Sequence, residues 1–369
     1  MLILLTSTEL DGFVVPTPTL PVLIRILLSS IIVVPPILIA IYRPRVHWVV
    51  LLQVFRLQFR SINNFNEIEI MNKTFYFMAG LPRSGSTLLS SILNQNPKFY
   101  SGPSSPVLGT MANIENNFLG NELYDGYPKP DQVREIIGSI PHHYYSDVKK
   151  PIVFDKNRAW TARIPYIEGY IGQQAKILVP VRRIDEILTS ILLMIRRNPF
   201  QEGQEKINFV DEQLVKNNIP ISDFNRCDFL LSNGGVVRQS LSAIMEGFEH
   251  NFRDKMHFVD YNDLVSRPEN TMENVYDFLG EEFYEHDFES VTNAHKENDL
   301  RTYGLSDMHD VRSKVEKTAP HPSSVLPAEI IDLYNQNKDR LEFWGTPNII
   351  TVTPKVKAPL TKNNSIVFK

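Results

Sequence analysis

Residues suited to binding phosphate lie between an apolar run and an amphipathic helix pattern in the stretch Thr74–Asn94. A strand, a glycine-bounded loop and a helix start together aim backbone N–H groups at an anion. Residues 80–87 fit the nucleotide-binding pattern G-x-x-x-x-G-K-S/T, except that serine replaces the lysine that reaches the β- and γ-phosphates. An NTPase is therefore disfavoured. We expect the loop to hold one terminal phosphate through its amides and through Arg83, Ser84, Gly85, Ser86 and Thr87.

The loop sequence PRSGSTLL, Pro82–Leu89, resembles the binding loop of the sulfotransferases, most closely in the branch of tyrosylprotein sulfotransferases. This resemblance implies that the loop binds the 5′-phosphate side of 3′-phosphoadenosine 5′-phosphosulfate, the co-substrate of the family. In a second similar segment, Lys176–Ser190, the family binds the 3′-phosphate with an arginine and a serine eight residues apart. Arg182 and Ser190 have that spacing, and arginine offers phosphate a forked pair of donors. Arg183 is an alternative without this spacing.

Three further segments are similar to sulfotransferase motifs. In IVFDKNRAW, Lys156 stands where the family places a lysine near the sulfonyl group, and there it would stabilise charge on the leaving oxygen. In FVDYNDLVSRP, Tyr261 fits a position beside the nucleotide. Residues 309–317 resemble a late loop that closes over the donor. The sequence does not decide which of its cations contacts phosphate, and Lys314 is our candidate.

The general base stays open. Tyrosylprotein sulfotransferases carry a glutamate pair shortly after the loop helix, but residues 100–106 contain no carboxylate, and Ser104 stands where the base would be. This departure also puts a tyrosine acceptor in doubt. Carbohydrate, lipid, small-molecule and peptide acceptors remain open. The alternatives for the base are Asp155, His142, His143 and His309.

The order of strand and helix patterns predicts an α/β fold, a three-layer αβα sandwich around a mostly parallel sheet, as the resemblance also implies. We expect strands near Thr74–Ala79, Ile152–Phe154, Ile177–Val181 and His257–Tyr261, and a helix at Phe209–Lys216. The stretches 116–130 and 217–235 contain glycine and proline, and we expect them to be surface loops.

Composition limits the classes of function. The chain has 369 residues and a net charge of −4, which gives no electrostatic footprint for a nucleic-acid partner. Cys227 is the single cysteine, so an intrachain disulfide and a cysteine-ligated zinc are excluded. The histidines show no metal-ligand spacing, and we expect no metal. A single cysteine fits a reducing, cytoplasmic compartment.

The two ends differ in character from the centre. We predict a sulfotransferase domain at residues 71–350 and a basic, disordered tail at 351–369. Residues 1–70 are an apolar extension with two interpretations. Residues 20–42 are either a membrane anchor, which by the positions of the following arginines would leave the domain facing the cytoplasm, or part of a segment upstream of a true start at Met71.

Two other functions compete with sulfuryl transfer. A phosphotransferase of the nucleotide-kinase type would use the same loop, but the serine in place of lysine argues against it. A nucleotide-binding module that has lost catalysis would explain the missing glutamate base. The resemblance favours a sulfotransferase that transfers a sulfuryl group to an acceptor hydroxyl or amine.

Overall fold

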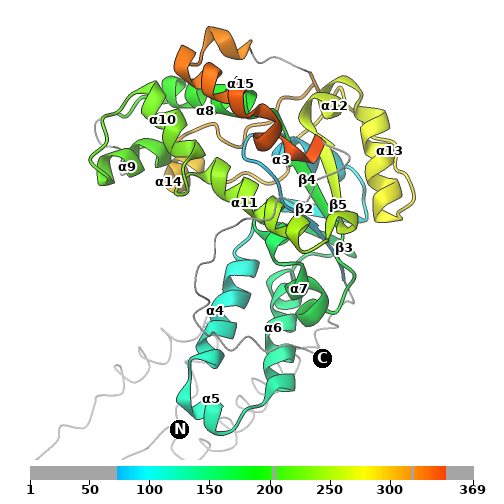
Figure 1. Cartoon of the computed structure of the whole chain (residues 1–369). Helices are drawn as coiled ribbons and strands as arrows, with labels where there is room; N and C mark the ends of the chain where they lie inside the picture. The colour runs from blue at the N-terminus through cyan, green and yellow to red at the C-terminus, as the bar shows by residue number, and fades with distance from the viewer. Residues whose placement is uncertain (1–72, 202–203, 205, 317–319, 346–369) are drawn as a thin grey trace, which may run out of the picture. The chain divides into compact units, whose positions relative to one another are not determined.

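Five parallel strands form the centre of the computed structural model, which describes residues 73–201, 204, 206–316 and 320–345. The spatial order is β2-β3-β1-β4-β5, so the strand that precedes the phosphate loop lies in the middle. Figure 1 shows helices around these strands. All four strand pairs are parallel. The strands are β1 (Thr74–Met78), β2 (Phe99–Ser104), β3 (Ile152–Lys156), β4 (Ile177–Val181) and β5 (Met256–Asp260).

Helices connect and cover these strands. They are α3 (Ser86–Leu93), α4 (Val107–Leu119), α5 (Glu122–Gly126), α6 (Pro130–Tyr144), α7 (Ile164–Tyr166), α8 (Ile184–Arg197), α9 (Phe209–Lys216), α10 (Asp223–Leu231), α11 (Val236–Glu249), α12 (Tyr261–Ser266), α13 (Pro268–Leu279), α14 (Asp299–Tyr303) and α15 (Ala328–Leu341).

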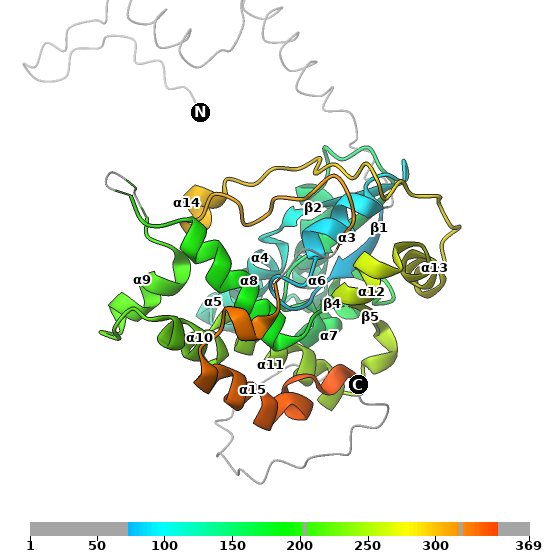
Figure 2. The same ribbon diagram turned by 90° about the horizontal axis from the view of Figure 1, so that it is seen from above.

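Two hydrophobic cores lie on opposite faces of the sheet, because successive strand residues point to opposite sides. Phe75 and Phe77 belong to the core that includes residues of α8 and α11. Tyr76 and Met78 belong to the core that includes residues of α3, α12 and α13. Figure 2 shows α3 and α11 on opposite sides of the strands. The predicted three-layer αβα architecture is therefore confirmed.

The four predicted strands are present, with the last shifted to end at Asp260 so that Tyr261 begins α12. The sequence analysis did not predict β2. Its sequence FYSGPS contains glycine and proline, which weaken a strand pattern. Proline is tolerated here because β2 is an edge strand, and its pairing with β3 is irregular between Ser101 and Ser104.

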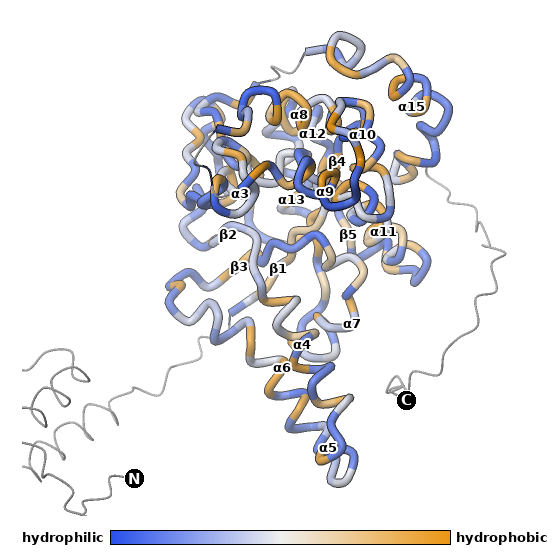
Figure 3. The backbone as a smooth tube through the Cα atoms, turned by 90° about the vertical axis from the view of Figure 1, so that its left-hand side faces the viewer, coloured by the Kyte–Doolittle hydropathy of each residue, from blue (hydrophilic) through white to orange (hydrophobic). Residues whose placement is uncertain are grey.

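Helices occupy much of the two stretches that we expected to be loops. The expectation for 116–130 was wrong: it contains the end of α4 and all of α5. α4 and α6 pack together, and α5 joins them at the far end to form a helical arm, residues 107–144, with apolar and polar stretches along it (Figure 3). The stretch 217–235 contains α10, whose side chains Cys227 and Leu230 are fully buried. The predicted helix at 209–216 is confirmed as α9.

The predictions for the ends of the chain concern residues outside the described part. The apolar extension at 1–70, with its segment 20–42, and the tail at 351–369 both fall there. Among the described residues, no helix combines the length and the apolar character needed to cross a membrane.

Replacing Asp155 should destabilise the domain. Its fully buried carboxyl accepts hydrogen bonds from Ser105 Oγ (2.5 Å), Tyr145 Oη (2.8 Å) and Trp160 Nε1 (2.6 Å). Asp155→Ala leaves three donors without an acceptor, which should cost about 3 kcal/mol or more of unfolding free energy, measured by urea denaturation. The exposed Asp339→Ala in α15 is the control. Equal urea midpoints for the two variants would contradict this account.

Candidate active site

A cavity of about 280 Å³ lies where the loops leave the carboxyl ends of β1, β3 and β4. This is the edge of a parallel sheet at which ligands usually bind. Its walls come from the phosphate loop, the end of β3, helix α8 and the late segment 308–316. Most predicted site residues line it, namely Arg83, Gly85, Ser86, Thr87, Lys156, Arg182, Ser190, Tyr261 and Lys314.

The phosphate loop lines this cavity and leads into helix α3. Arg83 and Gly85 adopt left-handed conformations, with φ of 56° and 86°. A side chain at Gly85 would also meet Tyr261, since an added Cβ would lie 2.8 Å from the ring. No side chain caps the following helix α3, and its first turn contains no acidic residue. The first N–H groups of α3 are therefore available to an anion.

Ser84 is the one predicted loop residue that does not line the cavity. Its buried hydroxyl donates to the carbonyl oxygens of Leu81 (2.5 Å) and Pro180 (2.9 Å). The side chain thus fastens the loop to β4. We predicted this hydroxyl as a phosphate donor, but in this structure both of its contacts are to backbone carbonyls.

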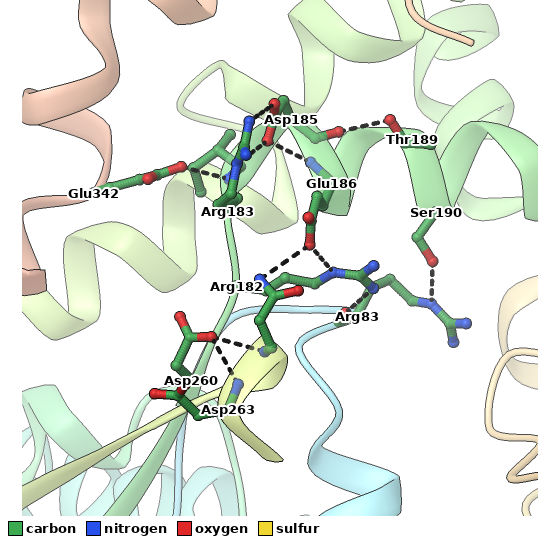
Figure 4. Close-up of polar contacts among 12 residues, drawn as sticks. Arg83, Arg182, Arg183, Asp185, Glu186, Thr189, Ser190, Asp260, Asp263 and Glu342 are labelled. Carbon is green, nitrogen blue, oxygen red and sulfur yellow. Dashed lines mark hydrogen bonds and ion pairs between the residues drawn. The ribbon is translucent and has the colours of Figure 1, made fainter. Parts of the chain in front are cut away.

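Arg182 is buried at the end of β4 with one donor unused (Figure 4). Its Nε donates to Glu186 Oε2 (2.9 Å) and its Nη1 to the carbonyl of Arg83 (3.2 Å). The guanidinium carbon lies 4.0 Å from the centre of the Tyr261 ring. No described residue accepts a hydrogen bond from the buried Nη2. A buried donor without an acceptor is costly, so Nη2 is suited to an anionic ligand.

Arg183, the alternative to Arg182, does not line the cavity. Its Nε and Nη2 donate to the two carboxylate oxygens of Asp185, at 3.1 and 2.5 Å. This hydrogen-bonded pair raises the pKa of the guanidinium above its ordinary range. The structure therefore places Arg182, and not its neighbour, in the lining of the cavity that also contains Ser190.

Arg83 ties the phosphate loop to two other walls. Its Nε donates to Ser190 Oγ at 3.1 Å, and its Nη1 donates to the carbonyl of Met308. Burial, and then the positive charge of Arg182, lower its pKa. The segment that contains Met308 is held further by Asp307, which accepts from Arg197 Nη2 (2.9 Å) and from Asn198 (2.8 Å).

Lys156 ends β3 and is 6% exposed. Burial lowers the pKa of its ammonium group, and Glu297 and Asp299 partly oppose this shift while Arg158 adds to it. A surface pair with the neighbouring Asp155 is not formed, since that carboxyl lies in the core. Lys156 therefore presents a desolvated cation to the cavity at the carboxyl end of β3.

Lys314 lines the same cavity from the late segment. Its ammonium lies 2.7 Å from Glu289 Oε2, and that carboxylate raises its pKa. Its side chain is 54% exposed. Lys314 is thus at the rim, where it is available to a ligand only in competition with Glu289.

The structure separates the candidates for a general base. Asp155 is internal, His142 packs edge-on against the buried ring of Phe75, and His143 is exposed; none of the three lines the cavity. His309 lines it, and Ser104 lies in the same wall. Of the four alternatives, only His309 lines the cavity.

Sequence reasoning missed Arg158, Glu297 and Asp299, which lie around Lys156 and His309. Arg158 lines the cavity, and Glu297 and Asp299 contact His309. No sequence motif indicates these residues, because Asp299 contacts His309 only through the path of the late segment. One ligand-type atom from each of Glu297, Asp299 and His309 lies within 4.8 Å of the others. We assign no metal to this cluster, since His309 Nδ1 is already hydrogen-bonded to Asp299.

The chain is similar to sulfotransferases in sequence and loosely in structure. The model of the sulfotransferase family matches residues 76–286, more than half of the chain. None of the curated proteins compared with this sequence matches it. Mouse sulfotransferase SULT7A1 complexed with PAP is 14% identical, with 73% of this chain and 82% of that chain covered and a TM-score of 0.43. The sulfotransferase domain of the Synechococcus PCC 7002 olefin synthase is 21% identical, with 72% and 95% covered and a TM-score of 0.37.

Removing the Arg83 side chain should loosen the late segment. Arg83→Ala loses the donor to the Met308 carbonyl, a contact worth about 1.4 kcal/mol, so amides in 306–312 should exchange hydrogen roughly ten-fold faster. Hydrogen–deuterium exchange with mass spectrometry measures this. Arg312→Ala is the control, because this exposed arginine in the same segment has no hydrogen bond to a described residue. Equal exchange in the two variants would show that Arg83 does not hold the segment.

Proposed function

This chain belongs to the sulfotransferase family, and we propose that it transfers a sulfuryl group from 3′-phosphoadenosine 5′-phosphosulfate to an acceptor hydroxyl or amine. One observation carries the choice of donor. The uncapped start of α3 and the unused Nη2 of Arg182 are two separate anion-binding groups in one cavity. A nucleotide with phosphate at both the 5′ and the 3′ positions matches two such groups.

Each phosphate of the donor has its own set of residues in this proposal. Arg83, Gly85, Ser86 and Thr87 would bind the 5′ side together with the amides that begin α3. Arg182 and Ser190 would bind the 3′-phosphate, with Tyr261 supporting the guanidinium from one face. Lys314 would approach the donor from the rim after leaving Glu289.

Lys156 would act on the leaving group. The acceptor oxygen attacks sulfur in line with the bond to the bridging oxygen, and that oxygen gains negative charge as the bond breaks. A fixed cation in a desolvated site stabilises this charge more in the transition state than in the ground state. Lys156 is such a cation, and Arg158 is close enough to lower its pKa.

The structure offers less support to the two competing functions. A nucleotide-kinase-type phosphotransferase needs a loop cation at position 86, and serine stands there. A non-catalytic nucleotide-binding module needs no buried cation in the cavity, yet Lys156 lines the cavity at the cost of burial. Carbohydrate, lipid, small-molecule and peptide acceptors all fit the proposal.

The proposal predicts which nucleotide binds. In calorimetric titrations, the protein should bind adenosine 3′,5′-bisphosphate tightly and ATP with Mg²⁺ weakly, because the loop lacks the lysine that serves the γ-phosphate. A preference for ATP would overturn the proposed function. So would the absence of bisphosphate binding in protein whose folding is verified by its unfolding transition.

Arg182→Ala should weaken recognition of the 3′-phosphate specifically. Loss of a charge-assisted contact of about 2–3 kcal/mol should cut the preference for adenosine 3′,5′-bisphosphate over adenosine 5′-monophosphate by roughly 30- to 150-fold. The ratio of the two dissociation constants is the measurement, since a general loss of folding lowers both affinities alike. Arg183→Ala is the control, because its side chain faces Asp185. An unchanged ratio in Arg182→Ala would contradict its assignment.

Lys156 should set an alkaline limit to activity. Because its pKa is lowered from 10.5, the ammonium loses its proton at a lower pH than a free lysine would. Transfer should fall as the pH rises through this lowered pKa. Lys156→Arg, which stays charged, should remove this fall, while Lys156→Met should lose transfer and keep bisphosphate binding. The exposed Lys338→Met is the control. A pH profile shared by wild type and Lys156→Arg would show that another group is titrating.

A further inference from the structure

His309 is held by the carboxylate of Asp299 at two points. Its Nδ1 lies 2.6 Å from Asp299 Oδ1, and its backbone N–H donates to Asp299 Oδ2 at 2.8 Å. Asp299 is 6% exposed and begins α14, where Asn298 caps the helix. The ring orientation is therefore fixed by a buried group and not by solvent.

This contact determines which nitrogen of His309 carries the proton. A carboxylate only accepts hydrogen bonds, so Nδ1 must be the protonated nitrogen of the neutral ring. The other nitrogen, Nε2, is left with its lone pair. No hydrogen bond joins Nε2 to any residue in the described ranges, and the side chain lines the cavity. A base of this kind, oriented by a carboxylate, recurs in unrelated enzymes.

Charged groups surround His309 from several elements. Glu297 Oε2 lies 3.1 Å from Nδ1. The Tyr303 ring, also on α14, lies 5.6 Å away between centroids. Lys156 and Arg158 come from the end of β3, and Asp310 follows His309 in the cavity wall. The two carboxylates that contact His309 also raise the pKa of Lys156, so the base and the cation lie in one cluster.

We propose that His309 is the general base of the transfer, and that Asp299 is the residue that positions it. The inference rests on the proposed sulfuryl transfer. The acceptor O–H gives its proton to His309 Nε2 while its oxygen forms a bond to sulfur. The bond between sulfur and the bridging oxygen breaks, and its electron pair leaves with the 5′-phosphate beside Lys156. His309 then returns the proton to solvent.

With His309 as the general base, the cavity needs no carboxylate at position 104. Ser104 lies in the cavity but is too weakly basic to take a proton from an alcohol. His309 lines the same cavity but comes from the late segment, which follows β5 and α14 in the chain. The base would thus come from the late segment and not from the end of β2.

The test compares wild type with His309→Gln, Asp299→Asn and the distant, exposed His250→Gln. Labelled phosphoadenosine phosphosulfate is the donor, and 4-nitrophenol, 4-methylphenol and water are the acceptors. Water makes the assay independent of the natural acceptor. Calorimetry with adenosine 3′,5′-bisphosphate is run on every variant. The ¹⁵N chemical shifts of the His309 ring report its protonated nitrogen.

His309→Gln should slow transfer to 4-methylphenol and water by about 100-fold or more and leave bisphosphate binding unchanged. The effect should be much smaller with 4-nitrophenol, which ionises by itself near neutral pH. In wild type the shifts should show a proton on Nδ1 and none on Nε2. Asp299→Asn should reduce the share of rings with the proton on Nδ1, seen in the ¹⁵N shifts, and slow transfer to 4-methylphenol, because an amide can donate as well as accept a hydrogen bond.

Three results would overturn the inference, and they are distinguishable. Wild type that binds no bisphosphate, or that binds donor and transfers to nothing, refutes the proposed function itself. Wild type and His309→Gln with equal transfer to 4-methylphenol and water refute the base alone. Loss of wild-type activity in EDTA, with recovery on adding a divalent cation, would show that Glu297, Asp299 and His309 hold an ion instead.

Discussion

The close approach of β1 to β4 at Gly80 and Pro180 joins the phosphate loop to the neighbouring strand. A Cβ added to Gly80 would lie 2.2 Å from the carbonyl oxygen of Pro180, so only glycine fits between these strands. The same oxygen accepts hydrogen bonds from the Leu81 N–H and the Ser84 hydroxyl, both at 2.9 Å. Arg182 follows two residues later. The phosphate loop and the end of β4 are thus linked by direct contacts, and the hydrogen bond from Arg182 Nη1 to the Arg83 carbonyl adds to them.

The charges of the cavity are balanced by second partners in the protein. Glu186 satisfies one edge of the Arg182 guanidinium while leaving Nη2 free, and Glu289 pairs with Lys314 at the rim. Such partners reduce the repulsion among several cations in a small volume and orient each of them. For Lys156, burial is the largest cause of the lowered pKa, and Glu297 and Asp299 only partly oppose it. The pKa of Lys156, the cation proposed to act on the leaving group, therefore depends mainly on burial.

Local spacing predicted the parts of the site that lie within one strand–loop–helix unit. The phosphate loop before α3, and Arg182 with Ser190 at the end of β4 and on α8, each occupy one such unit, and the alternation of strands and helices gave the fold class. The strand β2 was missed because an edge strand tolerates glycine and proline that would interrupt a central one. The contact between His309 and Asp299 was missed because it depends on the path of an irregular segment. The Ser84 hydroxyl was misjudged since sequence does not show which carbonyl approaches it.

The helical arm occupies the connection between two neighbouring parallel strands, from the end of β2 at Ser104 to the start of β3 at Ile152. A crossover between such strands needs only about a dozen residues, and this one is several times longer. The sheet fixes its two ends, side chains such as Met111 and Ile137 enter the core, and α5 at its far end buries no residue. The length of the arm around α5 is therefore not limited by the close approach of β1 to β4. Insertions and deletions there would leave strand register, and with it the spacing of the anion-binding groups, unaltered.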